Sequence, residues 1–241
     1  MKLLALDSSG LVASVAVAED DNLIGEYTIN YKKTHSQTLL PMLDTVAKMI
    51  DLDLDTIDAI AIAKGPGSFT GLRIGSATAK GLGLALDKPI VEIPTVDGLA
   101  YNLWGSGDLV CPLMDARRNQ TYTGIYEFQN GEMQVLEPQC AVDISVIVEK
   151  INDLRRPVVF LGDGVPVFRV YIEEHVQVPY TFAPAHLNKQ RAGAVAALAF
   201  RYMEKEQVVS AREHQPDYLR LSQAERERKE KEARLPGDAG V

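Results

Sequence analysis

Apolar and polar positions in the first third of the chain predict three consecutive strands, followed by alternating helices and strands. The three apolar stretches, separated by short polar turns, are 2–6, 11–18 and 23–31. Apolar residues then recur every three or four positions over 34–50, which is the spacing of an amphipathic helix. Further strands are expected at 58–63 and 90–93, and further helices, the first capped by Ser68, at 68–86 and 95–103.

The same order begins again after a polar hinge at 105–108. Strands are predicted at 109–114, 121–128, 133–142, 158–161 and 176–179, and helices at 144–154, 167–174 and 188–205. An acidic residue, Asp7 or Asp115, follows the first strand of each half, and a glycine turn follows each fourth strand. The order β-β-β-α-β-α therefore occurs twice, which predicts a duplicated α/β fold with a cleft between its halves. This is the architecture of the actin, sugar-kinase and Hsp70 group.

Three segments follow from this pattern. We expect an N-terminal domain over 1–104 that carries the partner-binding helices, and a C-terminal domain over 108–222 whose last helix packs back on the first domain. The segment 223–241 alternates acidic and basic residues with almost no apolar ones, so a solvated, flexible tail is expected. A partner-docking segment is the alternative.

Composition limits the range of functions. The 241 residues include 46% hydrophobic ones, enough for substantial cores, and the net charge of -8 argues against a protein that grips nucleic acid alone. Cys111 and Cys140 lie outside any CxxC or zinc spacing, which favours reduced thiols in the cytoplasm. Polar residues from Asp7 interrupt the N-terminal apolar run, and no uncharged run is long enough to span a membrane.

Two glycine- and serine-containing turns are candidates for contact with phosphate. In ATPases of this architecture, the turn after the first strand presents hydroxyl and N–H groups to phosphates. The candidate residues are Asp7, Ser8, Ser9, Gly65, Gly67 and Ser68. No Gly-Lys-Ser/Thr follows the second turn, so this is not a Walker A loop, and tight structural turns remain the alternative.

The helix expected after the second turn carries a strip of small residues at i, i+4, i+8 and i+12. The strip consists of Gly71, Gly75, Ala79 and Gly83. Interior glycine costs about 1 kcal/mol relative to alanine, so such a strip predicts close approach of another helix, either from this chain or from a partner.

Catalytic motifs are missing from the sequence. The four histidines, His35, His175, His186 and His214, form no HExxH motif or i, i+4 pair, and no GxSxG is present. His35 is expected at a surface or near a helix cap. Asp115 and Asp163 could converge on the cleft, but a position in solvent-exposed turns explains the presence of these two residues equally well. Arg117–Arg118 forms a small basic spot after Asp115.

Four segments, in this order and spacing, resemble a known family. They are LLALDSS at 3–9, HSQTLLPML at 35–43, GPGSFTGLRIG at 65–75 and PDYLR at 216–220. Together they resemble the bacterial TsaB family, also called YeaZ, over the chain to about Ala224. The resemblance implies the actin/Hsp70-like fold and a part in forming N6-threonylcarbamoyladenosine at adenosine 37 of tRNAs that read ANN codons.

The resemblance also implies a subunit without a catalytic site of its own. It would bind and activate the paralogue TsaD, which holds a metal through a His-x-x-x-His pair, and TsaE would join the pair. Alone, the chain would form a homodimer; tRNA would be reached through the complex, and ATP with Mg²⁺ only at a subunit junction. The implied interface is Leu39, Leu40, Leu43, Val46, Gly71, Ile74, Gly75, Thr78, Ala79 and Leu82.

Three other functions are alternatives to this reading. An ATPase or kinase of the same fold would use Asp7, Ser8 and Ser9, with Asp115 as a second acid. The sequence offers no clear adenosine loop beyond 162–164. A metallopeptidase is disfavoured by the missing ligand pair, and a stand-alone RNA-binding module by the acidic charge.

Overall fold

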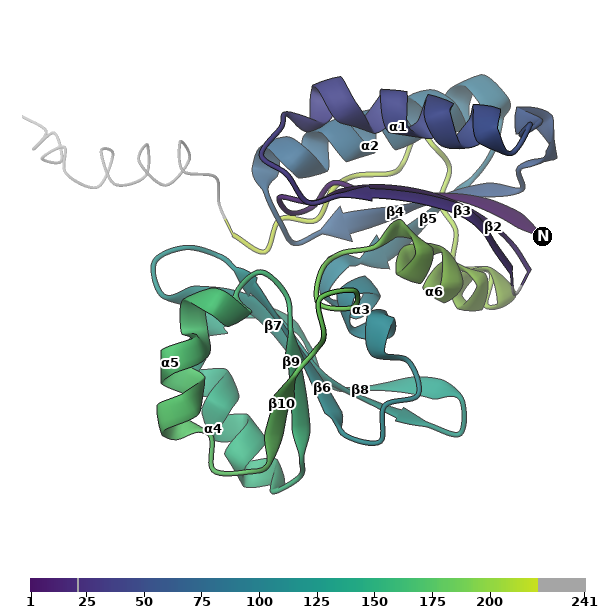
Figure 1. Ribbon diagram of the computed structural model, residues 1–241. Coiled ribbons are helices and arrows are strands. Elements are labelled where there is room, and N and C mark those ends of the chain that lie inside the picture. The colour runs from purple at the N-terminus through teal and green to yellow at the C-terminus, as the bar shows by residue number, and fades with distance from the viewer. Residues whose placement is uncertain (21, 221–241) are drawn as a thin grey trace, which may run out of the picture.

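The computed structural model describes residues 1–20 and 22–220 and folds them into two α/β domains, each built on a five-stranded sheet (Figure 1). The expected tail at 223–241 lies outside the described residues, as do the last two positions of the expected second domain.

The first half of the chain supplies the first sheet and three helices. These are β1 (Lys2–Asp7), β2 (Ala13–Glu19), β3 (Asn22–Ile29), α1 (His35–Met49), β4 (Ala59–Gly65), α2 (Phe69–Leu86), β5 (Ile90–Pro94) and α3 (Thr95–Ala100). Single 3₁₀ turns lie at Leu54–Thr56 and Tyr101–Leu103.

The second half repeats this order. Its elements are β6 (Leu109–Asp115), β7 (Gln120–Gln129), β8 (Glu132–Asp143), α4 (Ile144–Leu154), β9 (Val158–Leu161), α5 (Val165–His175), β10 (Tyr180–Phe182) and α6 (Ala192–Glu204).

The two sheets have the same topology. The strand order is β3-β2-β1-β4-β5 in one and β8-β7-β6-β9-β10 in the other. In each, the first strand pairs antiparallel with the second and parallel with the fourth, and the fifth pairs parallel with the fourth. The predicted duplication is therefore confirmed, although the sequence halves have little residue identity.

Each sheet is covered on both faces. The helices α1 and α2 lie side by side over one face of the first sheet, where Leu6, Leu39 and Ile62 share a core (Figure 1). The other face is covered by α6 from the far end of the chain, which packs on β1 and β2. In the second sheet α4 and α5 cover one face, and α3 packs against β6 and β7 on the other. Each half of the sequence thus contributes a helix to the opposite domain or to the junction.

The strand expected at 176–179 is wrong. The N–H of Val176 instead donates to the carbonyl of Ile172 (3.0 Å), which completes the last turn of α5. Pro179 has no N–H to donate to a ladder, and pairing with β9 begins one residue later, where Tyr180 lies opposite Val158.

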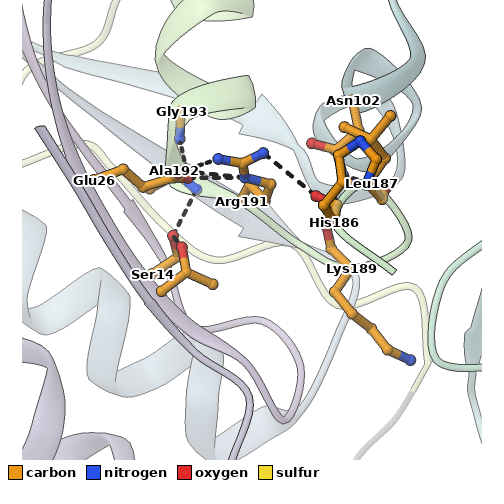
Figure 2. Close-up of polar contacts among 10 residues, drawn as sticks. Ser14, Glu26, Asn102, His186, Leu187, Lys189, Arg191, Ala192 and Gly193 are labelled. Atoms are coloured by element: carbon orange, nitrogen blue, oxygen red, sulfur yellow. Dashed lines mark hydrogen bonds and ion pairs between the residues drawn. The ribbon is translucent and has the colours of Figure 1, made fainter. Parts of the chain in front are cut away.

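The last helix begins at Ala192 rather than at the expected 188, because residues 185–189 form a turn and a bend that side chains from elsewhere hold in place. Asn102 Nδ2 donates to the carbonyls of Leu187 (3.1 Å) and Lys189 (2.6 Å) (Figure 2). Arg191 forms an ion pair with Glu26 of β3.

The first turn of α6 is capped from the other domain. The N–H of Ala192 donates to Ser14 Oγ (2.8 Å), and that of Gly193 donates to Glu26 Oε1 (3.0 Å) (Figure 2). These two side chains accept hydrogen bonds from N–H groups in the first turn of the helix, which in most helices are satisfied by a capping residue nearby in the sequence.

Candidate functional site: the interdomain cleft and the outer face of α2

A cavity of about 650 Å³ lies between the two domains. Its first-domain wall is the turn after β1 together with the start of α2, and its second-domain wall is the region after β6. The lining includes Ser9, Gly10, Lys33, His35, Gly67, Ser68, Thr70, Asp115, Arg117, Tyr122, Asp163 and Arg220. The cleft predicted from the duplication is present, and both glycine- and serine-containing turns reach it.

The turn after β1 directs most of its polar groups inward. Ser8 Oγ donates to the carbonyl of Gly71 (2.8 Å), and both the N–H and Oγ of Ser9 donate to Asp7 Oδ1 (2.9 and 2.7 Å). Burial raises the pKa of Asp7 to about 6, and the hydrogen bonds from Ser9 oppose part of that rise. Of this turn's candidates for phosphate contact, only Ser9 lines the cavity; Asp7 and Ser8 are buried beneath it.

The second turn is packed just as closely. The N–H of Ser68 donates to the carbonyl of Ser9 (2.7 Å), and Ser68 Oγ caps α2 by accepting from Gly71. A methyl group added at Gly65 would lie 2.1 Å from the carbonyl oxygen of Asp217, and one added at Gly67 would lie 2.3 Å from that of Ser9. Gly67 and Ser68 line the cavity, whereas Gly65 is covered by the C-terminal segment. The Ser9 and Ser68 N–H groups, which a phosphate would need, already have partners in the chain.

Two polar atoms beside the cleft have no hydrogen-bond partner among the described residues. His35 Nε2 lies 2.8 Å from the carbonyl of Gly10, but Nδ1 of the same ring is buried without a partner. The second atom is Asp163 Oδ1, and burial raises the pKa of that carboxyl. Of the two positions expected for His35, the one near a helix cap is confirmed, since His35 is the first residue of α1, whereas the surface position is wrong, since its side chain is buried against the turn after β1.

The structure divides the ten implied interface residues into two groups. Six are buried in the first domain: Leu39, Leu43, Val46, Gly71, Gly75 and Ala79. Three more, Ile74, Thr78 and Leu82, are partly exposed, and Leu40 is exposed. The first group packs α1 and α2 onto their own sheet, so only the second group is open to a partner.

The small-residue strip faces inward, and the atoms nearest to its glycines come mainly from the turn after β1 and the C-terminal segment. A methyl group at Gly71 would lie 2.1 Å from the carbonyl oxygen of Ser8, and one at Gly75 would lie 2.3 Å from Ser8 Oγ. At Gly83 it would lie 2.8 Å from Cβ of Ala211. The strip therefore lets α2 approach chiefly the turn after β1 and the C-terminal segment. At its glycines, the predicted approach of another helix is limited to Cδ2 of His35 in α1, 3.4 Å from a methyl group at Gly71.

A second row of residues, small from Ala77 onward, lies on the solvent side of the same helix. Arg73, Ala77, Gly81 and Ala85 follow one another at i+4 spacing and are all exposed, with Leu84 beside them. A methyl group added at Gly81 would meet no described atom within 4 Å. We call these five residues the outer ridge of α2. None of these five residues belongs to the strip predicted from the sequence.

No group of three or more His, Cys, Asp or Glu side chains in residues 1–20 and 22–220 is arranged to hold a metal ion. In the same residues, no helix combines the length and apolarity needed to cross a membrane.

Two sheets of identical strand order, joined around a cleft, define the duplicated actin/Hsp70-like class of α/β proteins. Residues 22–228 match the family model described as TsaD: tRNA N6-adenosine threonylcarbamoyltransferase. The chain belongs to this family, and within it to the TsaB (YeaZ) proteins, as its relatives show.

Two relatives carry the name tRNA threonylcarbamoyladenosine biosynthesis protein TsaB. The one from Bacillus subtilis is 35% identical, over 93% of this chain and 96% of its own length. The one from Haemophilus influenzae is 30% identical, over 91% of this chain and 94% of its own. The solved structure of YeaZ from Pseudomonas aeruginosa is 28% identical, with a TM-score of 0.75 over 90% of this chain and 99% of that one. The resemblance drawn from the four sequence segments is confirmed.

Proposed function

We propose that this chain is a non-catalytic subunit of the machinery that forms threonylcarbamoyladenosine in tRNA, and that it acts by docking the threonylcarbamoyltransferase TsaD. The names of its relatives support the pathway. A TsaD-type enzyme from Kosmotoga olearia is also 31% identical over 47% of this chain, which supports a paralogue of matching fold as the partner. In this proposal TsaE joins the pair, tRNA is reached through the complex, and the chain pairs with itself when alone.

The outer ridge of α2 is the observation that carries the docking proposal. Exposed small residues such as Ala77 and Gly81 let the backbone of a partner helix approach closely, and no described atom lies within 4 Å of a methyl group added at Gly81. Apolar side chains are exposed nearby: Leu84 within the ridge is 56% exposed, and Leu40 on the neighbouring helix α1 is 52% exposed. Large apolar side chains of this kind are what a protein–protein interface covers.

Replacing the ridge glycine with a large charged residue tests this proposal. Gly81→Arg projects into solvent in the isolated chain, so it leaves folding intact, but it fills the space that a partner helix would occupy. Val170→Arg is the matched control, because Val170 is 66% exposed on α5 of the other domain. We expect wild type and Val170→Arg to form a heterodimer with TsaD in light scattering, and Gly81→Arg to remain unbound.

The same proteins are then assayed for threonylcarbamoyladenosine in a reconstituted reaction with TsaD and TsaE. The product should be lost with Gly81→Arg and retained with Val170→Arg. A folded Gly81→Arg protein that still bound TsaD and supported modification would refute this surface. Product formed by the isolated chain without TsaD would refute the non-catalytic role.

A further inference from the structure

The C-terminal segment 207–220, which we call the strap, runs from the end of α6 along the edge of the first domain and on toward the cleft (Figure 1, yellow-green to yellow). It first extends the first sheet: Val209 and Ile90 exchange both backbone hydrogen bonds, each at 2.9 Å. Ala211 then fills the space opposite Gly83, on the buried side of α2.

The middle of the strap is fixed by buried polar contacts. His214 is fully buried, with Nδ1 2.7 Å from Glu92 Oε1, and Lys80 of α2 donates to the carbonyl of His214 (2.9 Å). Further along, the N–H of Asp217 donates to the carbonyl of Lys64 at the end of β4 (2.7 Å). The strap is therefore bound to the first domain from Val209 to Asp217.

The end of the strap touches both the partner side and the cleft side of the protein. The Tyr218 ring stacks on Phe69, with centroids 4.6 Å apart and planes at 4°, and its hydroxyl accepts from Arg73 Nε (3.3 Å). Phe69 lies about one helical turn before Arg73, so this stack lies at the N-terminal end of the outer ridge of α2. Two residues later, the Arg220 guanidinium donates to the carbonyl of Ala116 in the second domain and lines the cleft.

We propose that the strap couples partner docking on the outer ridge of α2 to closure of the interdomain cleft. This inference rests on the proposed function, since it takes TsaD as the partner. A partner on the ridge contacts Tyr218, which is 37% exposed. That contact holds the end of the strap in the position in which Arg220 donates its hydrogen bond to Ala116 of the second domain. Because coupling between two sites is reciprocal, loss of the Arg220 contact must weaken docking on a surface that Arg220 does not touch.

The test compares two arginine variants of the strap for binding to TsaD by titration calorimetry. Arg220→Gln removes the contact with Ala116, whereas Arg212→Gln is a matched control whose side chain is exposed earlier in the strap. We expect Arg220→Gln to bind at least about fivefold more weakly than wild type, and Arg212→Gln to bind as wild type does. Tyr218→Phe keeps the ring stack and should bind better than Tyr218→Ala.

Hydrogen exchange on the wild-type protein gives a second readout. TsaD should slow exchange at the Asp217 amide and also at residues 114–122 of the second domain, which a purely local contact would leave unchanged. Equal affinity for Arg220→Gln and wild type, with unchanged exchange at 114–122, would overturn the coupling while leaving the proposed function standing. Failure of wild type to bind TsaD at all would overturn the proposed function, and the coupling with it.

Discussion

Both faces of α2 carry glycine, but the glycines on the two faces have different surroundings. On the buried face, Gly71 and Gly75 have no side chain because the backbone and side chain of Ser8 occupy the space. On the solvent face, Gly81 has no side chain although no described atom stands in the way. The two rows at i+4 spacing, one with small residues throughout and one with small residues after Arg73, therefore face different surroundings. A row of small residues in a sequence indicates room for close approach without identifying what fills that room.

The buried face should be the less tolerant of the two, and Gly71→Ala is the sharpest test. The added methyl group would lie 2.1 Å from the carbonyl oxygen of Ser8, a backbone atom that cannot rotate away. Overpacking of this kind costs about 3 kcal/mol of unfolding free energy, measurable by urea denaturation. Gly107→Ala, where a methyl group would meet no described atom within 4 Å, is the control and should stay close to wild type. A Gly71→Ala protein as stable as wild type would show that the turn after β1 yields easily.

The duplicated fold could be read from the sequence because it depends on local patterns. Apolar runs such as β4, which is buried on both faces, and the amphipathic spacing of α1 place most elements within a few residues of their true bounds. The failures have non-local causes. The start of α6 is fixed by Ser14 and Glu26, which are more than 160 positions away in the chain, and no cap residue near 188 could reveal that.

The candidate site was predicted less completely. The resemblance implied an interface on two helices, but which of their residues are exposed depends on how α2 lies against Ser8 and Ala211. The sequence also could not reveal that His214 would be fully buried beside Glu92, since these residues are 122 positions apart. The one local signal for the strap was the PDYLR segment, which carries both Tyr218 and Arg220.

The turn beneath the buried face should make stability depend on pH. Burial raises the pKa of Asp7 from 3.8 to about 6, so its contribution to stability is fully present below pH 3.8 and is lost as pH rises through 6. Above pH 6 the buried charge costs up to about 3 kcal/mol, at about 1.36 kcal/mol per pKa unit.

An Asp7→Asn variant has no such titration. The unfolding free energy of wild type should therefore fall relative to that of Asp7→Asn between pH 4 and pH 7. Urea unfolding at several pH values measures the difference. A constant gap between the two proteins across this range would mean that Asp7 titrates alike in the folded and unfolded states.

The smallest effect gives the most direct comparison, because two glycines on opposite faces lie only two residues apart. Gly81→Ala adds a methyl group in open space and removes the entropic penalty of helical glycine, so the isolated chain should gain up to about 1 kcal/mol. Gly83→Ala gains the same helix propensity but places its methyl group 2.8 Å from Cβ of Ala211 and 3.1 Å from the carbonyl oxygen of Lys88, so it should lose stability overall. Thermal unfolding of the two variants in parallel should shift the melting temperature in opposite directions. Shifts of the same sign would mean that the strap moves aside for Gly83→Ala, and that the two faces of α2 are less different than their contacts indicate.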